Sequence, residues 1–183
     1  MKFKLVIRDY RHTDEAAVKG LWRDCELSKP WNDLTQDIDA LTHAQQAQLF
    51  VGELDGQIIT SAAAAYDGHR GWVYYVCVAP ALQSQGIGRA IMAAAEKWLA
   101  VRGANKVQLL IRPENRTAHS FYAAIGYHAA PRTMMQKWLT PPTQVEFGGL
   151  GDGLLTTTIS FLEMHERPKK RYVPSPGGKL ALM

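Results

Sequence analysis

The chain has 183 residues, of which 46% are hydrophobic and 21% charged, as is ordinary for one globular domain that buries its own core. No apolar run is long enough to cross a bilayer and the first residues lack the apolar core of a signal peptide, so we exclude a membrane protein and expect a cytoplasmic one. The net charge is +4, but the chain has no interleaved basic and aromatic residues, which argues against nucleic-acid binding. The positive charge can instead attract an anionic cofactor or simply be solvated at the surface.

The first part of the chain predicts a strand followed by two helices. Residues 4–8 are typical of a strand, and Thr13 is expected to cap the first helix. Asp33, with Gln36 three residues later, predicts the start of a second helix that runs to about Ala47. The first helix has apolar residues at helical spacing, which are Val18, Leu21, Trp22 and Cys25.

The middle of the chain predicts a hairpin, a third strand and a long helix. The Asp55-Gly56 pair between two apolar runs is typical of a tight hairpin turn. The expected elements are strands at 48–54 and 57–66, a turn at 67–71, a strand at 72–79 and a helix at 86–102. The long helix should end at Gly103 in a left-handed conformation. Its expected buried stripe is Ile87, Ile91, Ala94, Trp98 and Val101.

After the long helix we expect a strand at 106–111, a helix at 117–125 closed by Gly126, and a last strand at 133–139. Residues 1–140 then form one domain. Residues 141–183 change in composition, with a glycine-rich linker at 148–153 and a strand-like stretch at 156–164. Two interpretations stay open, a truncated second module of a tandem protein and a strand that pairs with a neighbouring subunit, the latter favouring a homodimer.

The most informative motif joins the strand that ends at Pro80 to the long helix. Residues 76–80 are a β-branched strand end, and residues 83–90 read Gln-Ser-Gln-Gly-Ile-Gly-Arg-Ala. Two glycines at a helix N-terminus let backbone amides approach an anion closely, and the helix dipole adds positive charge there. The motif lacks the Gly-Lys-Ser/Thr of a Walker loop, and Ile91 stands where a dinucleotide fingerprint has glycine. It therefore predicts a phosphate or pyrophosphate site of another kind.

The string from Val76 to Gly88 resembles the acetyl-CoA motif of the GNAT superfamily of N-acetyltransferases. A second stretch, at the distance expected in that family, matches its Asn-x-x-Ala-x-x-Phe-Tyr-x-x-x-Gly-aromatic signature with Asn115, Ala118, Phe121, Tyr122, Gly126 and Tyr127. The resemblance covers about three-quarters of the chain. It implies an α/β fold with a mixed, mostly antiparallel sheet flanked by helices, and transfer of an acetyl group from acetyl-CoA to a small-molecule or peptide amine.

The resemblance also assigns residues to the acetyl donor. Backbone groups of one β-strand, freed where that strand diverges from the next, are expected to bind the pantetheine arm and the thioester oxygen. Tyr122 stands where family members have a tyrosine that protonates the leaving thiolate. The implied donor-binding residues are Val76, Cys77, Val78, Gln83, Ser84, Gln85, Gly86, Ile87, Gly88, Arg89, Asn115 and Tyr122.

The general base has no clear counterpart. Trp72 and Leu110 stand at the positions where some relatives have a glutamate, so an ordered water beside Tyr74, Tyr75, Asp67 or Glu114 is the expected substitute. No cysteine has an activating histidine in sequence, which favours direct attack in a ternary complex, and no metal site is expected from the scattered histidines. The expected acceptor-binding residues are Trp31, Asn32, Asp33, Tyr66, Asp67 and Tyr74.

Two other functions fit the same sequence. The absent glutamate and the tail are compatible with an acyl-CoA-binding regulatory module that has no turnover. The strand-like tail is compatible with an interaction module that pairs strands with a partner. For Asp33 and Asp67, helix capping and turn formation are alternatives to substrate binding.

Overall fold

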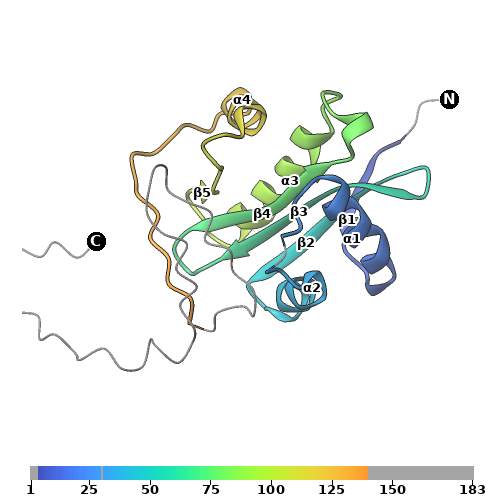
Figure 1. The fold of residues 1–183 in the computed structure, drawn as a ribbon, viewed down its shortest axis with the longest axis horizontal. Coiled ribbons are helices and arrows are strands. Elements are labelled where there is room, and N and C mark those ends of the chain that lie inside the picture. Colours follow the sequence, from blue (N-terminus) through green and yellow to red (C-terminus); the bar gives the residue numbers. More distant parts are fainter. Residues whose placement is uncertain (1–3, 30, 140–183) are drawn as a thin grey trace, which may run out of the picture. The chain divides into compact units, whose positions relative to one another are not determined.

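The computed structural model describes residues 4–29 and 31–139. Its elements follow the expected order as far as the last helix (Figure 1). The strands are β1 (Val6–Asp9), β2 (Ala47–Leu54), β3 (Gln57–Tyr66), β4 (Gly71–Val78) and β5 (Val107–Gln108). The α-helices are α1 (Glu15–Asp24), α2 (Leu34–His43), α3 (Ile87–Val101) and α4 (Arg116–Ala124), with short 3-10 turns η1 (His12–Asp14) and η2 (Pro80–Leu82).

The five strands form one sheet in the order β1-β2-β3-β4-β5. The first three pairings are antiparallel and only β4 with β5 is parallel, which confirms the mixed, mostly antiparallel sheet. Helices α1 and α2 cover one face of the sheet, and α3 and α4 belong to the core on the other (Figure 1). The alternation of β2 shows this division, since Leu49 and Val51 face the first core and Phe50 faces the second.

An extra residue interrupts the pairing of β3 with β4. Ser61 is opposite Cys77 and Ala63 is opposite Tyr74, so β4 has one more residue than β3 between these pairs. Tyr75 lies at this bulge with a φ of 49°, a left-handed conformation that is uncommon for a tyrosine. Because of the bulge, the Tyr75 side chain turns toward α1, where its ring stacks on Trp22 at 3.9 Å between centroids.

Several local expectations need correction. Thr13 does not cap α1, because the chain makes the 3-10 turn η1 first and the Asp14 carboxylate accepts the Arg11 amide at 2.8 Å. Helix α2 ends at His43 rather than near Ala47, because Ala47 already pairs with Ala65 in the sheet. The buried stripe of α3 is Ile87, Ile91, Met92, Ala95 and Leu99, whereas Val101 is 78% exposed.

The end of the described chain has less sheet than expected. β5 is only two residues long, and residues 133–139 form no strand. A strand needs a neighbour to pair with, whereas Met135 and Leu139 are each 91% exposed. The linker and strand expected in residues 141–183 lie outside the described residues. None of the described helices is long and apolar enough to cross a membrane.

Candidate active site

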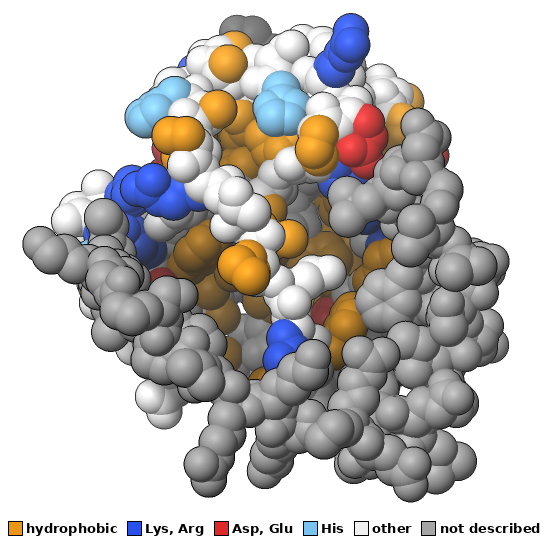
Figure 2. Space-filling view, turned by 60° about the vertical axis from the view of Figure 1, so that its left-hand side comes forward, with side chains coloured by type: hydrophobic (Ala, Val, Ile, Leu, Met, Phe, Trp, Pro, Cys, Tyr) orange, Lys and Arg blue, Asp and Glu red, His pale blue; other side chains and the backbone are white. Residues whose placement is uncertain are grey.

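The edge of β4 next to β5 is open over most of its length. β5 pairs with β4 only at Gly71 and Trp72, so the rest of β4 has no strand on that side within the described residues. The Ala79 amide donates to Ile59 at 2.8 Å on the β3 side, and strand alternation therefore directs the amides of Val76 and Val78 to the open edge. Figure 2, which brings the β5 and α4 side forward, shows hydrophobic side chains gathered in a hollow of this face.

The loop between β4 and α3 presents amides without partners. Ser84 and Gly86 both have positive φ, 61° and 81°, and Gly86 is the residue that precedes the first turn of α3. The amides of residues 84–86 donate to no protein acceptor in the described part of the chain. The first amides of α3, from Ile87, Gly88 and Arg89, are the ones that a helix leaves unpaired. Such a concave row of amides at a helix N-terminus fits an anion such as a pyrophosphate.

Side chains of the same loop hold it in place. The Gln83 amide nitrogen donates to the Val78 carbonyl at 3.2 Å, which ties the loop to the end of β4. Gly88 permits close packing, because a Cβ there would lie 3.0 Å from the Phe121 ring of α4. Arg89 donates to the Ala124 carbonyl at the end of α4 at 3.1 Å, so its side chain joins two helices.

Helix α4 begins and ends with residues of the second motif. The Asn115 carboxamide oxygen caps α4 by accepting the Ala118 amide at 3.0 Å. Tyr122 contacts Phe121 and Tyr127 edge to face, with centroids 5.0 and 5.5 Å away. Burial, and to a smaller degree the charge of a Cys77 thiolate, raise the pKa of Tyr122 to about 12, so its phenol stays protonated at neutral pH. Its hydroxyl makes no hydrogen bond to a described residue.

Cys77 lies beside this edge and faces the first core. The thiol is buried and 3.3 Å from the Ser61 hydroxyl. The adjacent Cys25 thiol and burial raise the pKa of the Cys77 thiol, which keeps it protonated and poorly nucleophilic. The arrangement therefore offers no activated cysteine at this position.

On the α1 and α2 side of β4, the loop after α1 meets the bulge. Asn32 Nδ2 donates to Asp37 Oδ2 at 2.9 Å, and the Tyr75 hydroxyl donates to the same oxygen at 2.6 Å. Asp37, on α2, was not expected at the site. Asn32 and Asp37 belong to no sequence motif that points to a site. Tyr75 faces Asp37 only because the bulge turns its side chain toward α2.

The other expected acceptor residues differ in whether their side chains are free, are engaged by the backbone, or pack against the core. Trp31 and Tyr74 are 39% and 43% exposed, which leaves their rings free for contact. Asp33 and Asp67 also serve the backbone: Asp33 caps α2 through the Thr35 amide at 2.8 Å, and Asp67 accepts the His69 amide at 2.8 Å and Trp72 Nε1 at 2.9 Å. Tyr66 packs against the core on the α3 side, away from Trp31 and Asn32.

The two positions where some relatives have a glutamate offer no proton acceptor. The Trp72 indole is engaged with Asp67, and Leu110, just after β5, is 65% exposed beside the open edge. Glu114 is exposed in the turn before α4. A base supplied by this chain must therefore be a residue other than Trp72 or Leu110.

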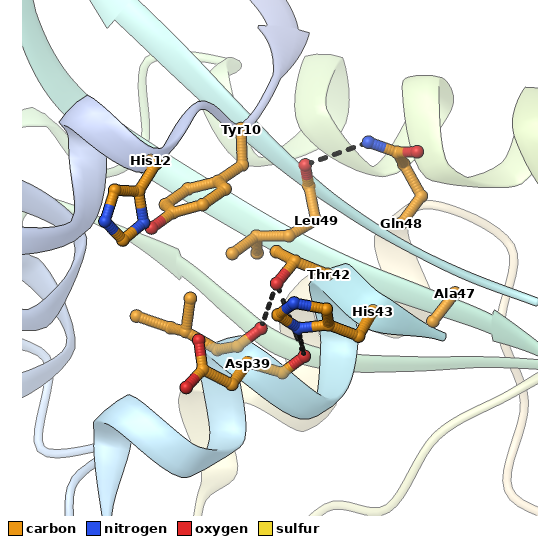
Figure 3. Close-up of a pocket in the computed structure, with 9 residues that line it drawn as sticks. Tyr10, His12, Asp39, Thr42, His43, Ala47, Gln48 and Leu49 are labelled. Carbon is orange, nitrogen blue, oxygen red and sulfur yellow. Dashed lines mark hydrogen bonds between the residues drawn. The ribbon is translucent and has the colours of Figure 1, made fainter. Parts of the chain in front are cut away.

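A separate pocket of about 450 Å³ lies at the end of α2 (Figure 3). It is lined by Tyr10, His12, Ile38, Asp39, Thr42, His43, Ala47, Gln48 and Leu49. The Tyr10 hydroxyl is buried without a partner among the described residues. None of the residues expected to bind donor or acceptor lines this pocket, so it is not part of the candidate active site.

Comparisons with known proteins agree with this geometry. The profile of the Acetyltransferase (GNAT) family matches residues 15–127, more than half of the chain. The chain belongs to the GNAT acetyltransferase family. Among curated GNAT relatives, an acetyltransferase of Pectobacterium atrosepticum and one of Sodalis glossinidius are each 37% identical over 121 residues. These residues are 66% of this chain and 86% and 85% of the two relatives. The protein is thus an acetyl-CoA-dependent acetyltransferase.

Solved structures show the same GNAT fold. Aminoglycoside N-acetyltransferase AAC(6')-Iy in complex with CoA has a TM-score of 0.67 and 19% identity, over 76% of this chain and 97% of that one. A putative acetyltransferase from Agrobacterium tumefaciens has a TM-score of 0.63 and 17% identity, over 73% and 99%. The recognition made from two sequence motifs is therefore confirmed at the level of family, fold and cofactor.

Proposed function

We propose that this GNAT acetyltransferase moves the acetyl group of acetyl-CoA directly to a primary amine of a small molecule. The observation that carries this proposal is the open edge of β4, which runs into the unpartnered amides at the start of α3 and ends beside Tyr122. The amides of residues 84–89 would bind the pyrophosphate, with Gln83 and Asn115 fixing the loop and the start of α4 beside it. The amides of Val76 and Val78 would bind the pantetheine arm.

The same edge supplies what the reaction needs. When the amine attacks the thioester, negative charge develops on the carbonyl oxygen, and a fixed amide of β4 would stabilise it by roughly 2.7–4 kcal/mol. The thiolate that leaves requires a proton, which the Tyr122 hydroxyl would donate. The protonated, buried Cys77 supports direct attack over a thioester on the enzyme, because a thiol with a raised pKa is a weak nucleophile.

The acceptor is proposed to be a small cationic amine. Support comes from the exposed ring of Trp31, which precedes Asn32 and Asp33 in the chain. It also comes from the exposed ring of Tyr74, whose pKa is raised by partial burial and by the charge of Asp67. Aromatic faces and carboxylates both attract ammonium groups. Further support comes from a fold neighbour, AAC(6')-Iy, described in complex with CoA-S-monomethyl-acetylneamine. A peptide amine is the other acceptor class that the test must separate.

The test has two stages. Calorimetric titration with acetyl-CoA and CoA measures donor binding, and thiol release then screens neamine, aliphatic diamines and peptides with free N-termini. Release with neamine or a diamine at rates above hydrolysis supports the proposal. Release only with peptides would contradict the small-molecule acceptor. Donor binding without any release would favour a regulatory module instead.

A homodimer and a cytoplasmic location remain predictions. The dimer depends on residues 141–183, which lie outside the described residues. Light scattering on the full chain and on a chain that ends at residue 140 tests it. A monomer in both cases would contradict the predicted strand pairing.

A further inference from the structure

The hydrogen bonds among Asn32, Asp37 and Tyr75 define which group donates to which. The Tyr75 hydroxyl donates to Asp37 Oδ2 at 2.6 Å, and Asn32 Nδ2 donates both to that oxygen at 2.9 Å and to the Tyr75 hydroxyl at 3.3 Å. A phenol oxygen has one proton and two acceptor positions. Asn32 donates to one position, and no other described residue donates to the second, so that position can accept a proton from a bound ligand.

Tyr75 is held firmly in this orientation. Its ring stacks on Trp22 at 3.9 Å, and the Ser61 hydroxyl donates to its carbonyl at 2.8 Å. Trp22 is itself fixed, because its Nε1 donates to that hydroxyl at 2.9 Å. The backbone of Tyr75 belongs to the bulge in the pairing of β3 with β4, and β4 is also the strand at whose other, open edge the thioester is proposed to bind. The phenol is therefore attached directly to the strand that would hold the reacting carbonyl.

The charge of the pair resides on Asp37. Burial, and next the hydrogen bond to the carboxylate, raise the pKa of Tyr75 well above its usual value, so the phenol is neutral at neutral pH. Asp67 is a weaker candidate base, because its two oxygens accept the amides of His69 and Arg70 and the indole of Trp72. Asp33 is committed to the cap of α2 in the same way.

We propose that Asp37 accepts the proton of the acceptor ammonium through Tyr75, and so replaces the glutamate that Trp72 and Leu110 do not supply. The proposal rests on the proposed function. In the step, an N–H bond of the ammonium breaks and an O–H bond to Tyr75 forms, while the original Tyr75 proton moves to Asp37 Oδ2. The electron pair left on nitrogen attacks the thioester carbon, and the tetrahedral intermediate collapses by breaking the C–S bond. The leaving thiolate takes the Tyr122 proton, and the second proton of the nitrogen returns to the Tyr122 phenolate through water. Asp37 then releases the first proton to water.

The test compares two nucleophiles that differ in their need for a base. An aliphatic amine, neamine or the fastest diamine of the screen, is cationic at pH 7.5, whereas an arylamine is already neutral. Wild type, Asp37→Asn and Tyr75→Phe are measured with saturating acetyl-CoA. Asp39→Asn is the matched control, since it removes the same charge from α2 at a position that lines the separate pocket of Figure 3.

We expect Asp37→Asn and Tyr75→Phe each to lower kcat for the aliphatic amine by roughly 100-fold and to change kcat for the arylamine by less than about threefold. The double variant should be no slower than either single one, because both interrupt a single relay. Equal losses with both nucleophiles, or none, would overturn the proposal. Wild type that acetylates the arylamine but no aliphatic amine would overturn it too. If wild type releases no thiol with any amine, the proposed function itself fails.

Discussion

The side of the candidate site proposed to bind the donor and the side proposed to bind the acceptor are built by different means. The donor side is backbone: amides of β4 and of the first turn of α3, positioned by glycines and by a short parallel pairing. The acceptor side is a set of side chains from the loop after α1, from α2 and from the bulge of β4. Backbone sites leave a local motif in a sequence, whereas side-chain sites assembled from three elements leave none. Variants on the two sides should therefore affect different quantities among the Kd of acetyl-CoA, the KM of the amine and kcat.

Tyr122→Phe should have the largest effect and change turnover alone. Without the hydroxyl the thiolate leaves unprotonated, and we expect kcat to fall by roughly 100- to 1000-fold while the Kd of acetyl-CoA is unchanged. Tyr127→Phe is the control, because that hydroxyl donates to Glu96 at 2.8 Å rather than to the open edge. Stopped-flow thiol release and calorimetry measure the two quantities. Equal losses in both variants would contradict the acid role of Tyr122.

Gly86→Glu should act on donor binding. The left-handed φ of 81° is strained for any side chain, and a carboxylate would stand among the amides proposed to bind phosphate. We expect the Kd of acetyl-CoA to rise by roughly 100-fold. Gly56→Glu, at a φ of 80° in the hairpin turn of β2 and β3, imposes the same backbone strain outside that loop. If calorimetry gives the same Kd for both variants, the loop does not bind the donor.

Trp31→Ala should act on acceptor binding. The half-exposed ring is proposed to contact the amine, so its loss should raise KM for the amine by roughly tenfold and leave the Kd of acetyl-CoA unchanged. Trp138→Ala removes an indole of similar exposure, 41% against 39%, and is expected to change neither constant. Steady-state thiol release at varied amine concentration measures KM. A changed donor Kd in Trp31→Ala would place Trp31 with the other side of the site.

Asp67→Asn should give the smallest effect, on the pH dependence of stability. The Arg70 amide, the Trp72 indole and the His69 amide hold the pKa of Asp67 at about 2, below its ordinary 3.8. A lowered pKa stabilises the fold above about pH 4, and this contribution disappears as the pH falls toward 2. Wild type should therefore melt above Asp67→Asn at pH 7, and the difference should shrink by pH 2.5. A constant difference in thermal melts would contradict this linkage.

Much of the fold follows from local sequence. The Asp55-Gly56 turn, the Asp33 cap and the Gly103 end of α3 are each set by the conformational preferences of one or two residues, and each occurs where predicted. The strand expected at 133–139 fails for the opposite reason. Apolar residues such as Met134, Met135, Trp138 and Leu139 favour a strand but provide no partner for it, and the described residues contain none there.

Two short motifs by themselves determined the family, the acetyl donor and the start of α3, because amides that bind phosphate require particular residues at fixed spacing. Only the tertiary structure brought together the side chains that we propose to face the acceptor. The bulge at Tyr75 reverses the alternation of β4 and brings its hydroxyl to Asp37, which lies 38 residues earlier in the chain. A register shift of this kind depends on how β3 and β4 pair, and no local preference encodes it.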